Sequence, residues 1–194
     1  TCAMPAAAYT GAASSDDAQE TSGTMALTGA NLNANSASQI IGLRFTNITI
    51  PPGSTINSAT LTVYVTSGSY DDPNLTIRGS GEADTTTFTS AANDITDRWK
   101  TSAAVSWNAG NIGAGAKNSP DLATLITEIL AISGWASGND MNFYITGASG
   151  SAFRINAYDN GSDIPQLTIN YTEPAAGGQP PRAMHQIRMR LACS

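Results

Sequence analysis

Two pairs of carboxylates are spaced closely enough to suggest acid–base chemistry. Glu82 lies two residues before Asp84, and Asp94 lies three residues before Asp97. Two carboxylates on either side of a cleft can cleave a glycosidic bond, one acting as the acid and the other as the base. Both pairs stand among Thr, Ser and Asn, which favours solvated charges on loops. The single histidine, His185, lies near the end of the chain, so a Ser–His–Asp system is also disfavoured, and we expect no enzymatic activity.

A further acidic group offers the hard oxygen ligands that Ca²⁺ prefers. Asp16, Asp17 and Glu20 are close in sequence, and Asp159 or Asp163 could complete the set. These residues are a candidate site for a structural calcium ion. The alternative interpretation is an acidic loop that holds no metal. We expect no other cofactor.

Exposed aromatic side chains are the usual platform for sugars, because a flat apolar ring can stack on the C–H face of a pyranose. The candidate platform residues are Trp99, Trp107, Tyr70 and Tyr64. Trp135 follows a helical segment and is expected in the core. Aromatic residues make up only 7% of the chain, so any such platform is small.

The end of the chain alternates apolar and basic side chains. The alternating residues are Ile187, Arg188, Met189, Arg190 and Leu191. This period is that of a strand, and a short isolated strand becomes ordered only by joining a sheet edge. We therefore predict a docking arm at residues 182–194, behind a Pro/Gly linker at 173–181, that adds to its own domain or to a neighbouring copy. The alternative is a disordered end.

The two cysteines, Cys2 and Cys193, lie near opposite ends of the chain. Their separation does not match the spacing of metal ligands. They are either free thiols or partners in a disulfide that joins the termini, within one chain or between copies, since the termini of compact domains often lie close together.

The composition is that of an extracellular or particle-bound β protein. Charged residues make up 12% of the chain and hydrophobic residues 41%, while Ser, Thr, Asn, Gly and Ala fill the difference. No secretion leader is visible. Thr1 follows either an excised initiator Met, which is the interpretation we favour, or a removed leader.

The net charge of −6 is unevenly distributed. Residues 1–173 contain all 15 acidic residues and six of the nine basic ones, which gives −9, whereas the remaining residues carry three arginines and no acid. An acidic body argues against a nucleic-acid partner. No apolar run is long enough to span a bilayer, so we expect no membrane insertion.

Alternating patterns predict many short strands. The clearest is ATLTVYV at 59–65, where small or apolar residues alternate with Thr and Tyr. Further strands are expected within 41–50, 75–78, 141–145, 153–157 and 167–171. The polar stretches 10–24, 66–73, 79–94 and 108–118 are expected to be loops or short edge strands. Together these patterns predict an all-β fold, a two-sheet β-sandwich spanning residues 1–172.

One amphipathic helix is expected at about 119–132. Ser119 can cap its N-terminus, Pro120 fits the first turn and Asp121 suits the positive end of the helix dipole. The apolar residues that follow recur with the helical period, at Leu122, Leu125, Ile126, Ile129 and Leu130. Such a stripe should close one end or face of the sandwich.

Several spaced motifs carry a family resemblance. They are IGLRFTNITIPPGSTI at 41–56, GWASGN at 134–139, FR at 153–154, AYD at 157–159 and PQL at 165–167. Over residues 9–172 the chain resembles a bacterial family of jelly-roll modules, similar to carbohydrate-binding β-sandwich domains and including the group named for its DNRLRE motif. The resemblance implies a jelly-roll fold and a module of secreted proteins, often beside an enzyme or an anchor.

The sequence departs from this family at two acidic motifs. Gln19 stands where an acid is common, and Asn31-Leu32-Asn33 replaces a second acidic motif. If those motifs hold Ca²⁺ in relatives, this chain should bind it weakly or not at all.

Two functions fit these observations. The first is a non-enzymatic structural surface protein of an assembled particle, such as a phage capsid decoration or tail component, whose arm docks on copies of itself or on another structural protein. The alternative is an extracellular carbohydrate-binding module that binds a surface glycan. The expected location is accordingly a virion or an extracellular surface.

Overall fold

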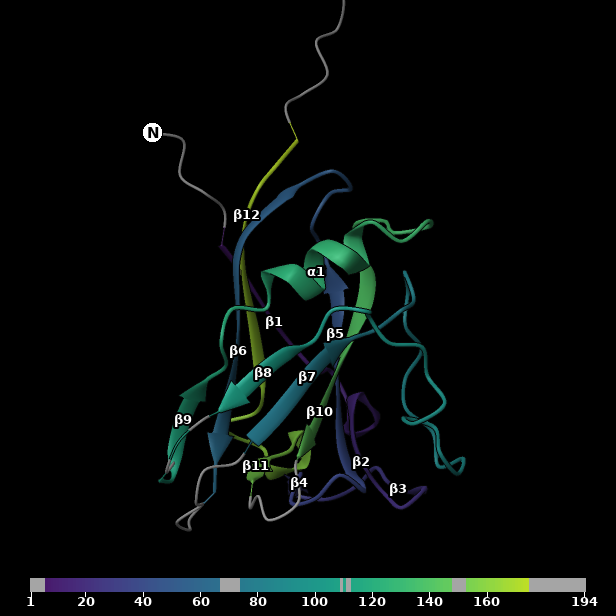
Figure 1. The fold of residues 1–194 in the computed structure, drawn as a ribbon, viewed down its shortest axis with the longest axis vertical. Helices are drawn as coiled ribbons and strands as arrows, with labels where there is room; N and C mark the ends of the chain where they lie inside the picture. Colours follow the sequence, from purple (N-terminus) through teal and green to yellow (C-terminus); the bar gives the residue numbers. More distant parts are fainter. Residues whose placement is uncertain (1–5, 67–73, 109, 111–112, 148–152, 175–194) are drawn as a thin grey trace, which may run out of the picture.

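The computed structural model describes residues 6–66, 74–108, 110, 113–147 and 153–174. Two antiparallel sheets pack face to face, so the predicted all-β sandwich is confirmed (Figure 1). The first sheet contains, in spatial order, β1 (Ala6–Thr10), β12 (Gln166–Thr172), β6 (Thr55–Val65), β11 (Arg154–Asn156) and β4 (Asn31–Asn33), with β9 (Gly115–Asn118) also pairing with β6. The second contains β3 (Thr24–Ala26), β2 (Asp17–Thr21), β5 (Gln39–Ile48), β10 (Asn139–Gly147), β7 (Asn74–Gly79) and β8 (Val105–Asn108).

The strand order is that of a jelly roll. One set of four neighbouring strands is β1, β12, β6 and β9, and the facing set is β5, β10, β7 and β8. The chain passes repeatedly from one set to the other, so that β5 is followed by β6 in the facing sheet and β9 by β10. This double-sheet arrangement leaves the first and last described strands side by side, with Ala6 opposite Asn170.

The core lies between the sheets and follows the predicted alternation. In β6 the inward side chains are all buried, and they are Ala59, Leu61, Val63 and Val65. In β5 and β10 the inward residues pair directly, as Leu43 does with Phe143. Burial of these apolar faces is the main stabilising contribution to the fold.

The helix is shorter than predicted: α1 spans Ala123–Leu130. Ser119 does not cap it, because its hydroxyl accepts the N–H of Leu61 at 3.0 Å and the chain still pairs with β6 there. Asp121 is the residue that accepts the first helical N–H, that of Ala123, at 3.0 Å. The predicted apolar stripe is correct in place and direction, since Leu125, Ile126 and Ile129 are buried in the core. In the described part of the chain, no helix has the length and apolar character needed to cross a bilayer.

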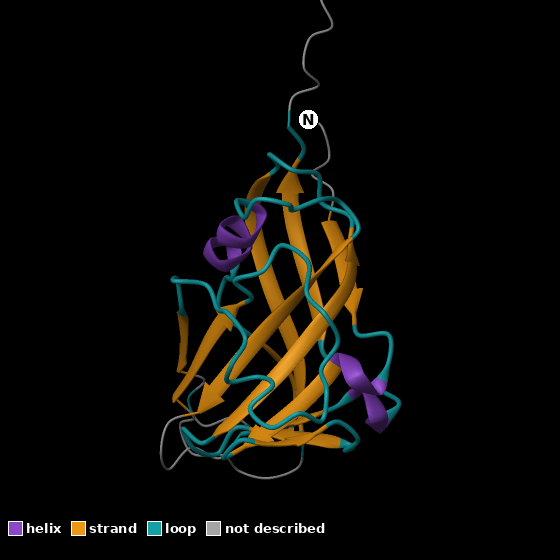
Figure 2. Ribbon diagram, turned by 90° about the vertical axis from the view of Figure 1, so that its right-hand side faces the viewer, coloured by secondary structure: helices purple, strands orange, loops and turns teal. Residues whose placement is uncertain are grey.

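The outer face of the second sheet is covered by chain rather than by solvent. Residues 80–104, between β7 and β8, cross this face, and we call them the cover segment; Figure 2 shows loops lying across the strands here. Phe88 and Ile95 of the cover segment are buried against Ala18 and Tyr144 of the sheet. The polar stretch predicted as a loop at 79–94 is therefore largely irregular, as expected, but two apolar side chains fix it to the sheet.

Gly42 on β5 permits this close packing. A Cβ atom at this position would lie 2.6 Å from Cζ of Phe88 and 3.0 Å from Cδ1 of Ile95. Both distances are shorter than van der Waals contact, so any larger residue must displace the cover segment. The cover segment can therefore pack this closely on β5 only because position 42 is a glycine.

Candidate functional site around Trp99

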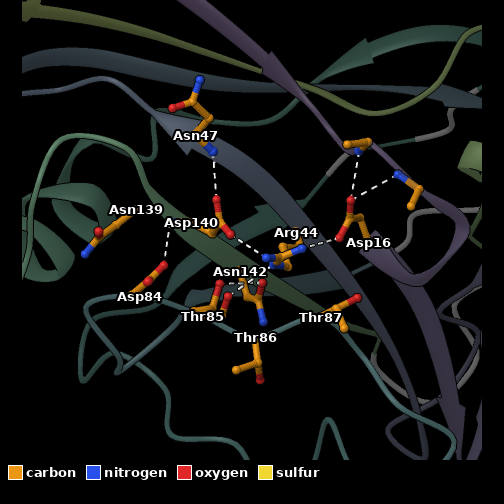
Figure 3. A network of polar contacts seen from close by, with 12 residues as sticks. Asp16, Arg44, Asn47, Asp84, Thr85, Thr86, Thr87, Asn139, Asp140 and Asn142 are labelled. Carbon is orange, nitrogen blue, oxygen red and sulfur yellow. Dashed lines mark hydrogen bonds and ion pairs between the residues drawn. The ribbon is translucent and has the colours of Figure 1, made fainter.

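A polar network fixes the first part of the cover segment to the sheet (Figure 3). Arg44 on β5 lies between the carboxylates of Asp16 and Asp140 and forms an ion pair with each. Its Nε also donates to the carbonyl of Thr85 at 3.1 Å, and the Thr85 hydroxyl donates to the side-chain oxygen of Asn142 at 3.0 Å. Because these groups are largely shielded from water, the network fixes the position of the segment where it leaves β7.

Glu20 on β2 fixes the middle of the cover segment. Its buried carboxylate accepts the N–H of Ile95 at 2.9 Å, the N–H of Thr96 at 2.8 Å and the hydroxyl of Thr96. The N–H of Asn93 donates to the carbonyl of Gly23 at 2.9 Å. Residues 93–96 are therefore held against the edge of the sheet by both side-chain and main-chain contacts.

The donor groups of Arg98 bind within the cover segment. Its guanidinium donates to the carbonyls of Thr86 and Thr87, each at 2.8 Å, and forms an ion pair with Asp94 at 2.9 Å. The same group lies 4.7 Å above the ring of Phe88. Arg98 thus links both halves of the segment and covers its apolar anchor.

Lys100, like Arg98, uses its donor groups within the cover segment. Its ammonium donates to the carbonyls of Ile95, Thr96 and Arg98 at 2.8–3.1 Å. It lies 4.9 Å from the centre of the Tyr144 ring. Burial lowers the pKa of Lys100 from its usual value, because the charged form loses water that the carbonyls replace only in part.

An open basin of about 420 Å³ lies on the outer surface of the cover segment. Trp99 forms one wall, and its side chain is 76% exposed; within the described residues no other large apolar side chain is exposed. The complete lining is Glu82, Thr86, Ala91, Ala92, Asp94, Asp97, Arg98 and Trp99. An exposed indole beside carboxylates and hydroxyl groups is an amphipathic surface suited to a ligand with both apolar and polar faces.

The main chain of Trp99 is fixed although its ring is exposed. Its carbonyl accepts the N–H of Gly81 at 2.8 Å, and the neighbouring Ser80 and Lys100 form a β-bridge. A Cβ atom at Gly81 would lie 3.0 Å from Cβ of Trp99. The bridge therefore places Trp99 beside residues 80–81, which directly precede Glu82.

The carboxylates around the basin have different partners. Asp94 is paired with Arg98 and accepts the N–H of Thr89 at 3.0 Å. Glu82 and Asp97 form no ion pair with any side chain in the described ranges. The basin therefore combines one aromatic wall with two carboxylates that are open to a ligand.

The predicted carboxylate pairs are divided by the fold. Asp84 lies outside the basin lining and accepts the N–H of Asp140 at 3.0 Å, while Glu82 lines the basin. Asp94 is held by its ion pair, while Asp97 is exposed. Three of the four carboxylates thus border one hollow, where they can accept hydrogen bonds from hydroxyl or amino groups.

Trp107 is not part of a platform, and that prediction is wrong. Its side chain is 5% exposed and packs edge-on against Phe153, with ring centroids 5.5 Å apart. In β8, Trp107 lies on the same side of the strand as Val105, and both contribute to the core between the sheets. Trp135 is buried, as predicted, and its Nε1 donates to the carbonyl of Ile50 at 3.2 Å.

Tyr64 lies on the opposite side of the sandwich from Trp99. It is half-buried on the outer face of β6 and lines a separate hollow of about 160 Å³, together with Asp163 and Gln166. The cover segment with Trp99 lies on the outer face of the other sheet. The two aromatic residues therefore cannot form one platform.

The predicted calcium ligands do not converge. Asp16 and Glu20 face the cover segment, where they bind Arg44 and residues 95–96. Asp17 points to the other side of β2 and accepts the N–H of Tyr158. Across the described ranges, no three His, Cys, Asp or Glu side chains are grouped as a metal site requires, because adjacent strand positions alternate between faces.

Burial makes the carboxyl of Asp17 a weaker acid than usual. Its pKa is raised from 3.8 to about 7, mainly because burial desolvates the charged form; the hydrogen bond from Tyr158 opposes this shift, and the neighbouring Asp159 and Asp16 contribute to it. The carboxyl is therefore largely protonated in mildly acidic solution.

Several predicted site residues lie outside the described residues. These are Tyr70, Cys2, Cys193 and the arm residues Ile187, Arg188, Met189, Arg190 and Leu191. The platform role of Tyr70, the disulfide and the docking arm remain predictions.

Sequence reasoning identified Trp99 but not its surroundings. The sequence indicates Glu82, Asp94 and Asp97 only as members of candidate catalytic pairs, and it gives no signal for Arg98 or Thr86 as site residues. The closely spaced charges at 94–100, DITDRWK, would have indicated that Asp94 and Arg98 lie one helical turn apart and could pair.

Comparison with known proteins gives no family or relative. No model of a known protein family matches the chain, and no curated protein sequence is significantly similar to it.

Proposed function

We propose that this protein is a non-enzymatic binding domain that recognises carbohydrate in the basin around Trp99. The observation that carries the proposal is the exposure of Trp99 next to groups that can bind hydroxyls. Exposing an indole to water is unfavourable by roughly 25 cal/mol per Å² of apolar surface. A ring kept exposed on a fixed main chain is therefore a surface that a ligand can cover with a gain in free energy.

The surroundings of Trp99 support a sugar in particular. A pyranose presents C–H groups on its faces and hydroxyls around its edge. The indole can cover a face, while Glu82 and Asp97 can accept hydrogen bonds from the hydroxyls. The openness of the basin suits an extended chain of sugars better than a small enclosed ligand. The jelly-roll fold and the resemblance of residues 9–172 to carbohydrate-binding modules favour the same function.

Affinity electrophoresis tests this proposal. The full chain is run through native gels that contain neutral, amino or acidic polysaccharides, and at least one should retard it. Trp99→Ala should abolish the retardation, whereas Tyr64→Ala, on the opposite face, should leave it unchanged. If none of the polysaccharides retards the wild type, or if Trp99→Ala is retarded equally, the proposal is wrong.

A structural role in an assembled particle is the second candidate, and one observation favours it. The outward positions of β1, β12 and β6 carry no charged side chain, although residues 1–173 have a net charge of −9. These positions are Ala6, Ala8, Thr10, Ser58, Thr60, Thr62, Tyr64, Gln166, Thr168 and Asn170. A like-charged copy could approach this face without charge repulsion.

Light scattering separates the two candidates. The solution mass of the full chain is compared with that of a chain ending at Glu173. A discrete oligomer that dissociates on truncation supports assembly through the arm, whereas monomers in both cases exclude self-assembly through the arm.

A further inference from the structure

We propose that the basin around Trp99 selects sugars with a free, protonated amine, such as the glucosamine units of deacetylated chitin, over N-acetylated and acidic sugars. This inference rests on the proposed carbohydrate-binding function and specifies its ligand. It follows from which charges near the indole are already bound within the protein and which are open to a ligand.

The basic groups near Trp99 are not available to an acidic sugar. Arg98 donates from Nε to the carbonyl of Asp94 at 3.2 Å and uses its other nitrogens for Thr86, Thr87 and the Asp94 carboxylate. Among the residues that line the basin, Arg98 is the only basic one. Lys100 donates to three carbonyls and faces Tyr144. A uronate or sulfate group would therefore find no free cation here.

The open charges of the basin are negative. Glu82 and Asp97 line it and make no ion pair within the described residues. An acidic sugar would be repelled by these two carboxylates, whereas an ammonium group would be attracted to them. The net charge of −9 on residues 1–173 acts in the same direction at longer range.

The indole adds a second attraction for the same group. A cation within about 6 Å of an aromatic ring is attracted by its electron-rich face, most strongly with Trp. Trp99 forms the wall of the basin that contains Glu82 and Asp97. Acetylation of the amine removes the charge and so removes both attractions, although stacking of the sugar ring remains. The basin should therefore distinguish amino sugars from N-acetyl sugars by charge.

Calorimetry with matched oligosaccharides tests the inference. The full chain is titrated with the hexamers of glucosamine, N-acetylglucosamine and galacturonic acid. We expect the glucosamine hexamer to bind on the order of tenfold more tightly than the N-acetylated one, since an ammonium–carboxylate contact and a cation–π contact each strengthen binding about twofold to fivefold at exposed sites. Its affinity should fall as salt is added, and the uronate hexamer should not bind.

Three variants test whether the preference for an amine comes from the carboxylates of the basin. Glu82→Gln and Asp97→Asn should each weaken binding of the glucosamine hexamer about threefold to fivefold. They should weaken the N-acetylated hexamer less, because the amide oxygen of Gln or Asn can still accept a hydrogen bond from a sugar hydroxyl. Asp163→Asn is the matched control, because it removes one negative charge on the opposite face of the sandwich, and it should change neither affinity. An equal loss with Asp163→Asn would show that only net charge matters and would overturn the inference.

The remaining outcomes separate this inference from the proposed function. If the glucosamine and N-acetylglucosamine hexamers bind equally and both depend on Trp99, the selection for amines is wrong and carbohydrate binding stands. If no saccharide binds in a Trp99-dependent way, both are wrong.

Discussion

The carboxylate of Glu20 accepts the main-chain N–H of Thr96 at 2.8 Å, which joins β2 to a segment far along the chain. The same carboxylate also accepts the N–H of Ile95. Ile95 and Phe88 are in turn the apolar residues that attach the cover segment to the sheet. The position of the Trp99 basin therefore depends on contacts made on the hidden side of the segment that forms it.

Glu20→Ala should destabilise the fold and loosen the cover segment. The change leaves two N–H groups without their acceptor in a site shielded from water, and each buried unsatisfied donor costs about 1–3 kcal/mol. Urea unfolding should show a loss in the free energy of unfolding of at least about 1–3 kcal/mol. Limited proteolysis should cut within residues 80–104 more rapidly than in the wild type. Thr96→Val removes only the hydroxyl contact and should have a smaller effect. Unchanged proteolysis of the Glu20→Ala variant would contradict this description of the anchor.

Gly42→Ala should destabilise the protein through a steric clash with the cover segment. The new Cβ atom would lie 2.6 Å from Phe88, and overpacking of this kind costs about 1–3 kcal/mol. A second change, Phe88→Leu, removes the ring atoms in the way. The double variant should therefore lose less stability than the sum of the two single variants, which a double-mutant cycle measures. Simple additivity would show that Gly42 and Phe88 do not constrain each other.

Truncation of Trp107 should destabilise the fold strongly, whereas truncation of Trp99 should hardly change its stability. Trp107→Ala should cost about 3–5 kcal/mol, because it empties a large volume in the core beside Phe153. Trp99→Ala should change the free energy of unfolding by no more than about 0.5 kcal/mol, since its ring is mostly in water. Chemical denaturation of both variants checks this contrast. A large loss with Trp99→Ala would mean that the ring supports the fold rather than a ligand.

Asp17 should make stability fall as pH rises through neutrality. Its pKa is about 7 in the folded protein and near 3.8 without burial, so the folded state binds the proton more tightly. The resulting stabilisation is complete below about pH 4 and is lost as pH rises through 7. Asp17→Asn resembles the protonated form and can still accept from Tyr158. Its stability relative to wild type should therefore increase between about pH 4 and pH 8, by on the order of 4 kcal/mol.

Urea unfolding at several pH values measures this difference. The control is Asp163→Asn, an exposed carboxylate that is not among the groups shifting the pKa of Asp17, and its stability relative to wild type should vary much less with pH. A constant difference between Asp17→Asn and wild type at all pH values would mean that the carboxyl of Asp17 does not titrate near neutrality.

Local patterns were sufficient for the long central strands and the helix, but not for β1, β4 and β8, and β2 lies inside the second sheet rather than in a loop or at an edge. In 59–65 the alternation of apolar and polar residues determines which face is buried, and the apolar stripe of 122–130 can be buried only as a helix. The start of the helix could not be predicted in the same way. Ser119 looks like a cap in sequence, but β6 offers it the N–H of Leu61, a partner that only the folded sheet supplies.

The site depended on long-range packing and was harder to predict. Phe88 and Ile95 lie within a polar stretch and have no periodic neighbours, and the surface that buries them comes from Ala18, Gly42 and Tyr144 on three strands. Trp107 carried a usable signal, because Val105 and Trp107 alternate with Ser106 and Asn108 as in a strand. Composition alone could not distinguish it from Trp99, since polar residues flank both.

Acrylamide quenching of tryptophan emission tests the central claim most directly. The chain has three tryptophans, and Trp107 and Trp135 are buried, so Trp99 is the one that a quencher can reach. Saturation with the glucosamine hexamer should shift the emission to shorter wavelength and protect it from acrylamide, and the Trp99→Ala variant should show neither change. If the saccharide binds by calorimetry but leaves the quenching of the wild type unaltered, the ligand does not cover Trp99 and the proposed site is wrong.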